Sequence, residues 1–299
     1  SVGWRMHGRA ALIDKLEFFI ALARAQHFGR AAEECGITQP TLSAAIRDLE
    51  SELGVAVVER GQQFAGLTAE GLRVLEYAQR AAASAAELQQ ELACLRGGLS
   101  GRMRLGVIPT ALTVVASVTS DFALRHPRVH IEVLSLATDD ILARLRSFEL
   151  DAGIVYAESS HEPGLVMQPL APENHVLLVS QGRLSDERDR ISWREAAQLN
   201  LCLLTPDMQN RRTIDGVFRE LGCAPKVTLE SNSILNILAH VCTGNWCSIV
   251  PRSVLDVIGV PHGITTLDLV EPRLEWQTAL VALAREPASP MVTALFADT

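Results

Sequence analysis

Residues 31–54 read AAEECGITQPTLSAAIRDLESELG, and this stretch decides the fold of the N-terminal region. Gly36 suits the left-handed conformation that ends a short helix. Thr38 is expected to cap a second helix. Pro40 is tolerated in the first turn of this helix, because the N–H group that proline lacks would have no partner there. Gly54 is expected to end that second helix. A helix, a short glycine turn and another helix form the pattern of a helix-turn-helix.

The second of these helices has an apolar face and a polar face. The apolar side chains repeat at helical spacing and predict a buried stripe of Leu42, Ala45, Ile46, Leu49 and Leu53. The candidates for DNA contact on the polar face are Thr38, Gln39, Pro40, Thr41, Ser43 and Arg47. Gln pairs with adenine, Pro and Thr touch thymine methyl groups, and Ser and a helix N-terminus bind phosphate. A capped surface helix fits the same residues, so this helix alone leaves both interpretations open.

Two flanking segments complete the predicted N-terminal domain. Before the helix pair, apolar residues at i, i+3, i+4 and i+7 predict a first helix with Leu16 and Phe19 on its buried side. After it, residues 55–71 predict two short strands joined by a polar turn, with Arg60 at the root of this wing. The segment is not basic overall, so DNA binding would depend on the placement of a few arginines.

The N-terminal stretch resembles the DNA-binding domain of LysR-type transcriptional regulators from Leu16 to Gly71, in order and spacing. The resemblance is carried by Ala31-Ala32, the TQPTLS run, Ile46, Leu49-Glu50, Leu53-Gly54, Arg60 and Leu67-Thr68-x-x-Gly71. Ala44 departs from the pattern, because family members commonly carry a long polar or basic residue there, and Val57-Val58 replaces Leu-Phe. The resemblance implies a winged helix-turn-helix over residues 12–71. Within the family, the stretches LIDKLEFFIALARAQHFGRAAEECGITQPTLSAAI and VIPTAL resemble regulators of formate dehydrogenase operons.

A long helix is predicted to connect this domain to the rest of the chain, over residues 72–98. It contains no Gly or Pro before Gly97, and apolar residues alternate in steps of four and three. This heptad seam comprises Val74, Ala78, Ala81, Ala85, Leu88, Leu92 and Leu95. The seam predicts a helix that pairs with a second copy, and linker helices of LysR-type regulators pair in the same way. The alternative is a helix packed on its own domain.

Strands and helices alternate twice over residues 101–299, which predicts an α/β domain of two lobes with a mainly parallel sheet. The family resemblance implies a likeness to periplasmic binding proteins and a final strand, residues 276–284, that returns to the first lobe. Lobe I is expected over about 101–167 and 272–299, and lobe II over about 168–271. The whole chain is therefore expected to join an all-α winged helix-turn-helix, a linker helix and an α/β effector-binding domain.

Hydroxyl and amide groups follow several of the predicted strands. In sheets of this kind, ligands bind beyond the carboxyl ends of strands and against helix N-termini. The candidate effector-binding residues at these places are Thr110, Thr138, Thr205, Ser231 and Asn232. Such a set suits a small carboxylate, to which Arg211 or Arg212 could add charge. Each hydroxyl also fits a plain helix cap.

Composition and motifs narrow the function classes. The net charge of −8 disfavours a general polyanion binder, and no signal-peptide core or membrane-spanning run is found, which predicts a cytoplasmic protein without a membrane partner. The six dispersed cysteines are expected to be reduced and mostly buried, without a metal site. The alternative is a redox-sensing pair, for which Cys242 and Cys247 are the nearest in sequence. No dinucleotide, P-loop or hydrolase motif occurs, so we expect no enzyme activity and no cofactor.

The resulting prediction is a transcriptional regulator that binds double-stranded promoter DNA and a small-molecule effector. It is expected to form a homodimer or homotetramer, and RNA polymerase is a further candidate partner. The alternative is a cytosolic small-molecule-binding protein, or an enzyme, with an accessory helix-turn-helix.

Overall fold

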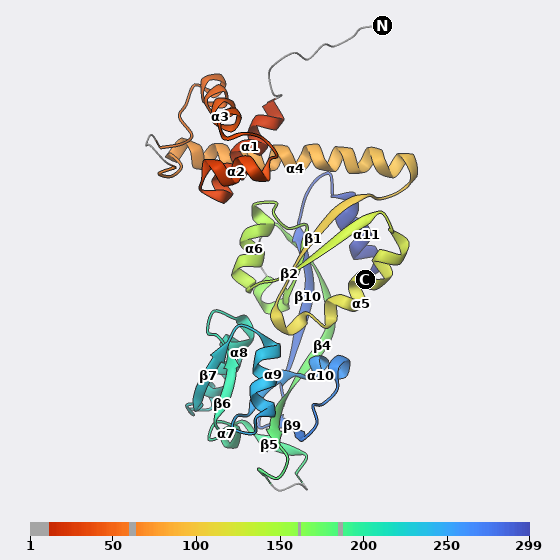
Figure 1. Cartoon of the computed structure of the whole chain (residues 1–299). Helices are drawn as coiled ribbons and strands as arrows, with labels where there is room; N and C mark the ends of the chain where they lie inside the picture. Colours follow the sequence, from red (N-terminus) through yellow and green to blue (C-terminus); the bar gives the residue numbers. More distant parts are fainter. Residues whose placement is uncertain (1–11, 60–63, 161–162, 185–187) are drawn as a thin grey trace. The chain divides into compact units, whose positions relative to one another are not determined.

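The computed structural model describes residues 12–59, 64–160, 163–184 and 188–299, and it divides into two compact units at Leu95 and Arg96 (Figure 1). The first unit begins with three helices, α1 (Leu12–Ala25), α2 (Phe28–Glu34) and α3 (Gln39–Leu53). As predicted, the Thr38 side chain caps α3 by accepting a hydrogen bond from Thr41 N. Gly36 and Gly54 both adopt positive φ, so the sequence signals for the ends of α2 and α3 are confirmed.

The core of the helix-turn-helix contains the predicted stripe of α3, with Leu42, Ile46 and Leu49 buried. The buried face of α1 differs from the simple periodic pattern because it includes Lys15, which is only 2% exposed. Its ammonium group lies 2.5 Å from Glu52 Oε1, so a part-buried ion pair joins α1 to the end of α3. A buried lysine without such a partner would carry a large desolvation cost.

The segment after α3 is fixed to the helices by side-chain hydrogen bonds. Glu50 Oε1 accepts hydrogen bonds from the backbone of Val57 and Val58, and Val58 forms an antiparallel bridge with Leu67. Thr68 donates to the carbonyl of Ala56 and accepts from Gly71 N, 2.8 Å away. These bonds give a physical reason for the Leu49-Glu50 and Leu67-Thr68 pairs. The turn of the predicted wing lies outside the described residues, as does Arg60.

Gly71 lies in the first turn of helix α4 (Ala69–Gly97), where the helix meets the strand-like segment. A Cβ atom at Gly71 would lie 2.1 Å from the carbonyl oxygen of Val57, which is shorter than any real contact. Only glycine therefore allows this approach of the two backbones.

Helix α4 confirms the predicted long connecting helix, but the two ends of its apolar seam have different surroundings. Ala78 is buried in the helix-turn-helix core, and Val74 packs against that core. Further along, Leu88, Leu92 and Leu95 are 59%, 43% and 81% exposed. The first part of the seam thus packs within its own domain, and the last part leaves a row of leucines uncovered in the single chain.

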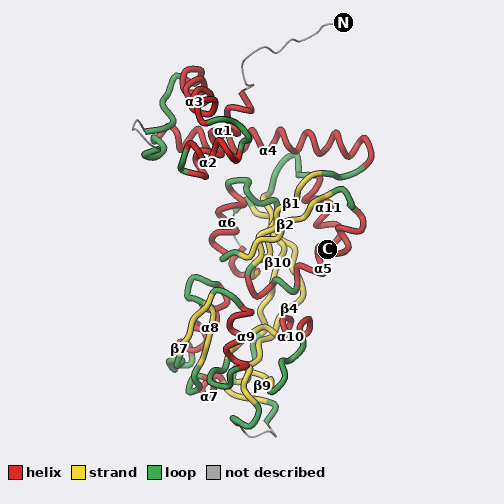
Figure 2. Tube along the Cα trace, viewed as in Figure 1, coloured by secondary structure: helices red, strands yellow, loops and turns green. Residues whose placement is uncertain are grey.

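Lobe I of the second unit is built on parallel strands. The order β2-β1-β3 comprises β1 (Gly101–Val107), β2 (Val129–Ser135) and β3 (Ala152–Tyr156). The helical elements are η1 (Pro109–Ala111), α5 (Val114–Arg125), α6 (Thr138–Arg146), η2 (Ala157–Ser160) and α11 (Pro290–Asp298). Helix α6 lies on one side of the strands, and α5 and α11 on the other (Figure 2). An added Cβ atom would lie 2.5 Å from Ile141 of α6 at Gly153, and 2.5 Å from Leu150 at Gly106, so these two glycines allow close packing against the strands.

Lobe II contains more elements than the sequence patterns predicted. Its strands are β5 (Arg190–Ser192), β6 (Leu201–Leu204), β7 (Val227–Ser231), β8 (Ser248–Pro251) and β9 (Ile264–Val270). Its helices are α7 (Trp193–Ala196), α8 (Gln209–Glu220), α9 (Ile234–Cys242) and α10 (Arg252–Ile258). Strands β5 and β9, helices α7 and α10, and the terminal helix α11 were not expected.

Two long strands join the lobes, β4 (Leu165–Ser180) and β10 (Glu275–Leu283). Strand β4 pairs with β10 as far as Asn174 and with β8 and β9 from His175 or Val176 onward. Strand β10 also pairs antiparallel with β3, which confirms that the last strand returns to lobe I. Because β4, β8, β9 and β10 form antiparallel pairs, the sheet is mixed, and the expectation of a mainly parallel sheet was wrong. Strand–helix alternation does not reveal the direction of strands that cross between lobes.

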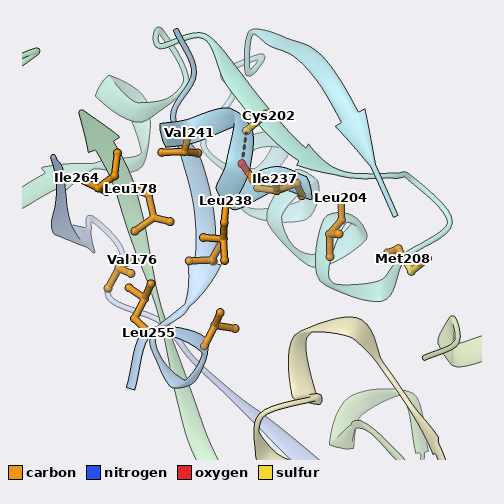
Figure 3. Close-up of a cluster of buried hydrophobic side chains, with 12 residues drawn as sticks. Val176, Leu178, Cys202, Leu204, Met208, Ile237, Leu238, Val241, Leu255 and Ile264 are labelled. Atoms are coloured by element: carbon orange, nitrogen blue, oxygen red, sulfur yellow. Dashed lines mark hydrogen bonds between the residues drawn. The ribbon is translucent and has the colours of Figure 1, made fainter. Parts of the chain in front are cut away.

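The core of lobe II lies between β4, β6, β8 and helices α9 and α10. Figure 3 shows ten of its side chains labelled, among them Val176, Leu238 and Cys202. The Cys202 thiol lies 3.8 Å from the carbonyl oxygen of Ile237, to which it donates a hydrogen bond. Cys202 therefore packs as a small apolar residue, with its polar atom used inside the core.

Candidate functional site

The face of α3 proposed for DNA contact is accessible in the first unit. Gln39, Pro40, Thr41 and Arg47 are exposed, Ser43 is half-buried, and Thr38 is exposed at the N-cap. The Thr38 and Thr41 hydroxyls lie 2.8 Å apart and share a hydrogen bond. This bond orders the first turn, and one of the two hydroxyl hydrogens remains available to an acceptor outside the helix.

The basic side chains of residues 12–59 differ in whether they already have a hydrogen-bonding or ion-pair partner within the protein. Lys15 pairs with Glu52, Arg24 with Glu34, and Arg30 donates to the carbonyl of Ala25. Arg47 makes no ion pair or side-chain hydrogen bond with any residue that the structure describes, and it is exposed on α3. It is therefore the arginine of this segment whose guanidinium group is free to meet phosphate.

A buried polar cluster lies where the two lobes meet. The Tyr156 hydroxyl, at the end of β3, lies 3.1 Å from Thr110 Oγ1 and accepts a hydrogen bond from Asn210 of α8 at 3.2 Å. Asn210 also lies 2.7 Å from Nε2 of His175, on β4. We call Thr110, Tyr156, Glu173, His175 and Asn210 the interlobe polar cluster. Sequence analysis had selected Thr110 alone from this set.

The titratable groups of the cluster are buried away from water. Burial raises the pKa of Glu173 to about 7, and Ser253 and Tyr156 oppose this shift by hydrogen bonding to the carboxyl group. Ser253 of α10 donates to Oε1 of Glu173. Burial also lowers the pKa of His175 to about 3, so the imidazole is neutral at physiological pH. Burial, with the Glu173 charge second, raises the pKa of Tyr156 above its ordinary range.

Two of the selected threonines have buried hydroxyls without a partner. Thr138 Oγ1 and Thr205 Oγ1 make no hydrogen bond within the described residues, and both atoms are buried. Helices α6 and α8, which begin beside these residues, have no side-chain cap. Arg212 of α8 forms an ion pair with Asp139 of α6 at 3.2 Å, so the first turns of the two helices are neighbours. Unpaired buried hydroxyls beside uncapped helix starts are places where a ligand or water would complete the hydrogen bonding.

The remaining candidates have more local roles. Ser231 accepts a hydrogen bond from Ser233 N, and its carbonyl accepts one from Thr205 N, so Ser231 lies next to Thr205. Asn232 is exposed and makes no hydrogen bond to the cluster among the described residues. Arg211 is buried and bonded to Asp215, Glu230 and the carbonyl of Leu204. Neither Arg211 nor Arg212 therefore offers an unused positive charge to a ligand.

Sequence reasoning missed the cluster members that come from strand interiors and one helix. Tyr156, Glu173 and His175 lie within or at the end of β strands, where their side chains give no periodic signal. Asn210 lies in the first turn of α8. Polar residues are common at the starts of helices, so its identity did not indicate a buried site. A polar residue in an otherwise apolar strand was the only available signal, and Glu173-Asn174-His175 before VLLVS carries it.

The six cysteines are free, but the expectation that most are buried was wrong. Only Cys202 and Cys247 are buried, Cys242 is exposed, and the other three are half-buried. Burial raises the pKa of Cys202 to about 11 and raises that of Cys247 as well. Among the described residues, no group of three or more His, Cys, Asp or Glu side chains could hold a metal ion. No helix in the described ranges has the length and apolarity needed to span a membrane.

Two family models match the chain. Residues 13–72 match the bacterial regulatory helix-turn-helix protein model of the LysR family, and residues 96–297 match the LysR substrate binding domain. The chain therefore belongs to the LysR family. It is a DNA-binding transcriptional regulator with an N-terminal helix-turn-helix and a C-terminal two-lobed domain of the kind that binds effectors in this family.

The curated relatives include activators named for peroxide. The chain is 27% identical to the hydrogen peroxide-inducible genes activator of Dickeya chrysanthemi over 281 residues, 93% of this chain and 90% of the relative. It is 30% identical to a probable hydrogen peroxide-inducible genes activator of Streptomyces viridosporus, covering 85% of this chain and 81% of the relative. The regulator CfxR of Cupriavidus necator is 26% identical, over 94% of this chain and 89% of its own length.

Solved structures of full-length regulators share the fold. A full-length OxyR variant from Pseudomonas aeruginosa is 25% identical, with a TM-score of 0.72 and 96% of each chain covered. CbnR in complex with its target DNA is 21% identical, with a TM-score of 0.68, 96% of this chain and 98% of that chain covered. The resemblance to regulators of formate dehydrogenase operons stays a prediction.

Proposed function

We propose that this regulator reads promoter DNA with the exposed face of α3 and is switched by a small carboxylate held between the lobes. DNA reading is assigned to Thr38, Gln39, Pro40, Thr41, Ser43 and Arg47, with Arg60 outside the described residues. Effector binding is assigned to Thr110, Thr138 and Thr205, supported by the neighbouring Ser231–Asn232 turn. The observation that carries the effector part is the pair of buried, unpaired hydroxyls beside the uncapped starts of α6 and α8.

Arg47→Ala is expected to weaken binding to promoter DNA and leave the fold intact. Arg47 is exposed and has no internal partner in the described structure, so its loss removes a phosphate contact rather than a stabilising one. The dependence of log affinity on log salt should flatten by about one unit. Fluorescence anisotropy with labelled promoter DNA at several salt concentrations measures both effects. Arg24→Ala is the matched control, and an unchanged affinity and salt slope in folded Arg47→Ala would remove α3 from the interface.

The chemistry of the lobe junction favours an anion that accepts hydrogen bonds. Unpaired hydroxyls donate to a carboxylate, and the backbone N–H groups at the starts of α6 and α8 add donors and a favourable dipole. No unused arginine completes an ion pair, so the affinity is expected to be modest, as suits a sensor of metabolite concentration. Protonated Glu173 would not repel the ligand, whereas its ionised form would, so binding should weaken as the pH rises through about 7.

Thr138→Val and Thr110→Val are expected to reduce the effector response while sparing DNA binding without effector. Valine keeps the shape of threonine but donates no hydrogen bond, and a ligand shifts a regulator only through its preference for one conformation. The measurement is promoter affinity with and without a panel of small carboxylates. Thr119→Val on α5, whose hydroxyl bonds only within its own helix, is the matched control. A wild-type response in both variants to a carboxylate that acts on the unmodified protein would reject the assignment.

The names of the relatives raise a second candidate, the sensing of hydrogen peroxide. A sensor thiol needs thiolate character and access to the oxidant. Burial and a raised pKa make Cys202 and Cys247 poor candidates, which leaves Cys242 as the exposed thiol. Treatment of the same DNA-binding assay with peroxide separates the two candidates. A change that Cys242→Ser abolishes would favour thiol-based sensing over a bound carboxylate.

Oligomerisation, contact with RNA polymerase and residence in the cytoplasm belong to the same proposal. The alternative functions are a small-molecule-binding protein and an enzyme. A protein of either kind would show no preference for promoter DNA in the assay.

A further inference from the structure

A separate pocket that is open to solvent, called the lobe II cavity below, lies at the opposite end of the lobe II strands from the candidate effector site. The volume of this cavity is about 730 Å³, within the range of small-molecule sites. It is lined by Ser180, Gln181, Gly182, Arg183, Asn200, Thr228, Gly244, Asn245 and Trp246. Asn200 precedes β6 and Thr228 lies near the start of β7, whereas Thr205 and Ser231 lie at the far ends of these parallel strands. The two sites therefore lie at opposite ends of the β6–β7 pair.

The walls of the cavity are held in place by hydrogen bonds. Trp246 Nε1 donates to Thr228 Oγ1 at 3.0 Å, and the indole packs edge-on against the His240 ring, with centroids 5.5 Å apart. Arg183 Nη1 donates to the carbonyl of Gly244 at 2.9 Å. These contacts fix the orientation of an aromatic ring and of a guanidinium group before any ligand arrives. A preorganised site of this kind loses little conformational entropy on binding.

The charge of the cavity selects for an anion. Among the residues that the structure describes, Arg183 is the only ionisable one that lines it. Within the described ranges, no acidic side chain forms an ion pair with Arg183, and its Nη2 and Nε atoms make no hydrogen bond to the protein. The positive charge of Arg183 also lowers the pKa of Cys247, against the raising effect of burial, so its field extends into the adjoining chain. The amides of Asn200 and Asn245 and the hydroxyl of Thr228 surround the charge with neutral hydrogen-bonding groups.

We infer that this cavity is a second ligand site, which takes a small aromatic carboxylate. The carboxylate would accept hydrogen bonds from the free guanidinium N–H groups of Arg183, and the ring would lie against the Trp246 indole. A guanidinium–carboxylate pair and an aromatic contact are both stronger where the protein groups are partly shielded from water. Arg183 and Trp246 are both half-buried. The site is independent of the interlobe polar cluster and of the proposed effector.

Isothermal titration of the full chain with benzoate tests the inference, with benzamide and cyclohexanecarboxylate as probes lacking the charge and the aromatic ring. Saturable benzoate binding is expected by about 10 mM, since such a small ligand binds in the range of millimolar dissociation constants. Both comparison probes should bind more weakly. Arg183→Gln should weaken benzoate binding about tenfold or more, and Arg183→Lys should restore part of it.

Two controls locate the site. Arg194→Gln removes an exposed arginine from α7 of the same lobe and should leave benzoate binding unchanged. Thr110→Val and Thr138→Val should also leave it unchanged, because those residues lie at the interlobe site. Trp246→Leu should weaken the binding without affecting Arg183. Absence of saturable binding, or binding that survives both Arg183→Gln and Trp246→Leu, overturns the inference. Binding lost in the threonine variants instead would place benzoate at the interlobe site and equally overturn it.

Discussion

Leu88→Glu is expected to dissociate the regulator into monomers and to abolish tight binding to promoter DNA. Leu88, Leu92 and Leu95 form the uncovered part of the α4 seam, and a row of exposed leucines at heptad spacing is covered when two such helices pair. A glutamate at this position would be buried without a partner in the pair, at a cost of several kcal/mol. Because two recognition helices must reach two half-sites, the monomer should lose most of its DNA affinity.

Light scattering measures the assembly, and anisotropy with promoter DNA measures the second effect. Ala86→Glu introduces the same charge on α4 away from the seam and should leave both the oligomer and the DNA affinity intact. If Leu88→Glu runs as the wild-type oligomer, α4 does not pair through this seam.

Glu173→Gln is expected to make the stability of the protein less dependent on pH. The pKa of Glu173 is raised by burial to about 7 in the folded protein and returns to about 4.5 on unfolding. Below about pH 4.5 the carboxyl is protonated in both states and costs nothing. As the pH rises from about 4.5 to about 7, the unfolded chain ionises while the buried carboxyl keeps its proton, so the folded state loses up to about 3 kcal/mol of stability, because one pKa unit corresponds to about 1.4 kcal/mol. Glutamine avoids this cost at every pH.

Urea unfolding at pH 5 and pH 8 provides the measurement for this variant. The free energy of unfolding of Glu173→Gln relative to wild type should rise between these pH values, apart from a constant offset for the buried amide. The neutral His175 contributes equally to both proteins and cancels. Glu220→Gln, at an exposed carboxyl on α8, is the control and should show no such trend. Parallel pH profiles for wild type and Glu173→Gln would show that Glu173 titrates normally.

The helix-turn-helix could be predicted from sequence because its signals are local. Gly36, Thr38 and Gly54 act on the backbone within a few residues, and the structure confirms the role of each. The long-range contacts that complete this unit could not be read in the same way. No local pattern predicts the burial of Lys15, because its ion pair with Glu52 depends on how α1 meets α3. The buried part of the α4 seam depends in the same way on packing against the first three helices.

The lobe junction was predicted only in part, for a related reason. Thr110, Thr138 and Thr205 were chosen because they follow strands, and strand ends are visible in the sequence. Glu173 and His175 belong to β4, whose length and antiparallel pairing follow from its passage between lobes. Asn210 reaches Tyr156 only because the two lobes come together. A local pattern cannot show which polar residues of distant elements meet in one buried cluster.

The most direct test of the central claim is the preference of the wild-type protein for promoter DNA. Fluorescence anisotropy should compare a labelled fragment from upstream of its own gene with a shuffled fragment of equal length, in the same buffer and salt. Sequence-specific regulators bind their sites about a thousandfold or more tighter than other DNA. We predict a preference of at least this order, reduced in Arg47→Ala. Equal affinity for both fragments, and for other upstream fragments from neighbouring operons, would contradict the account.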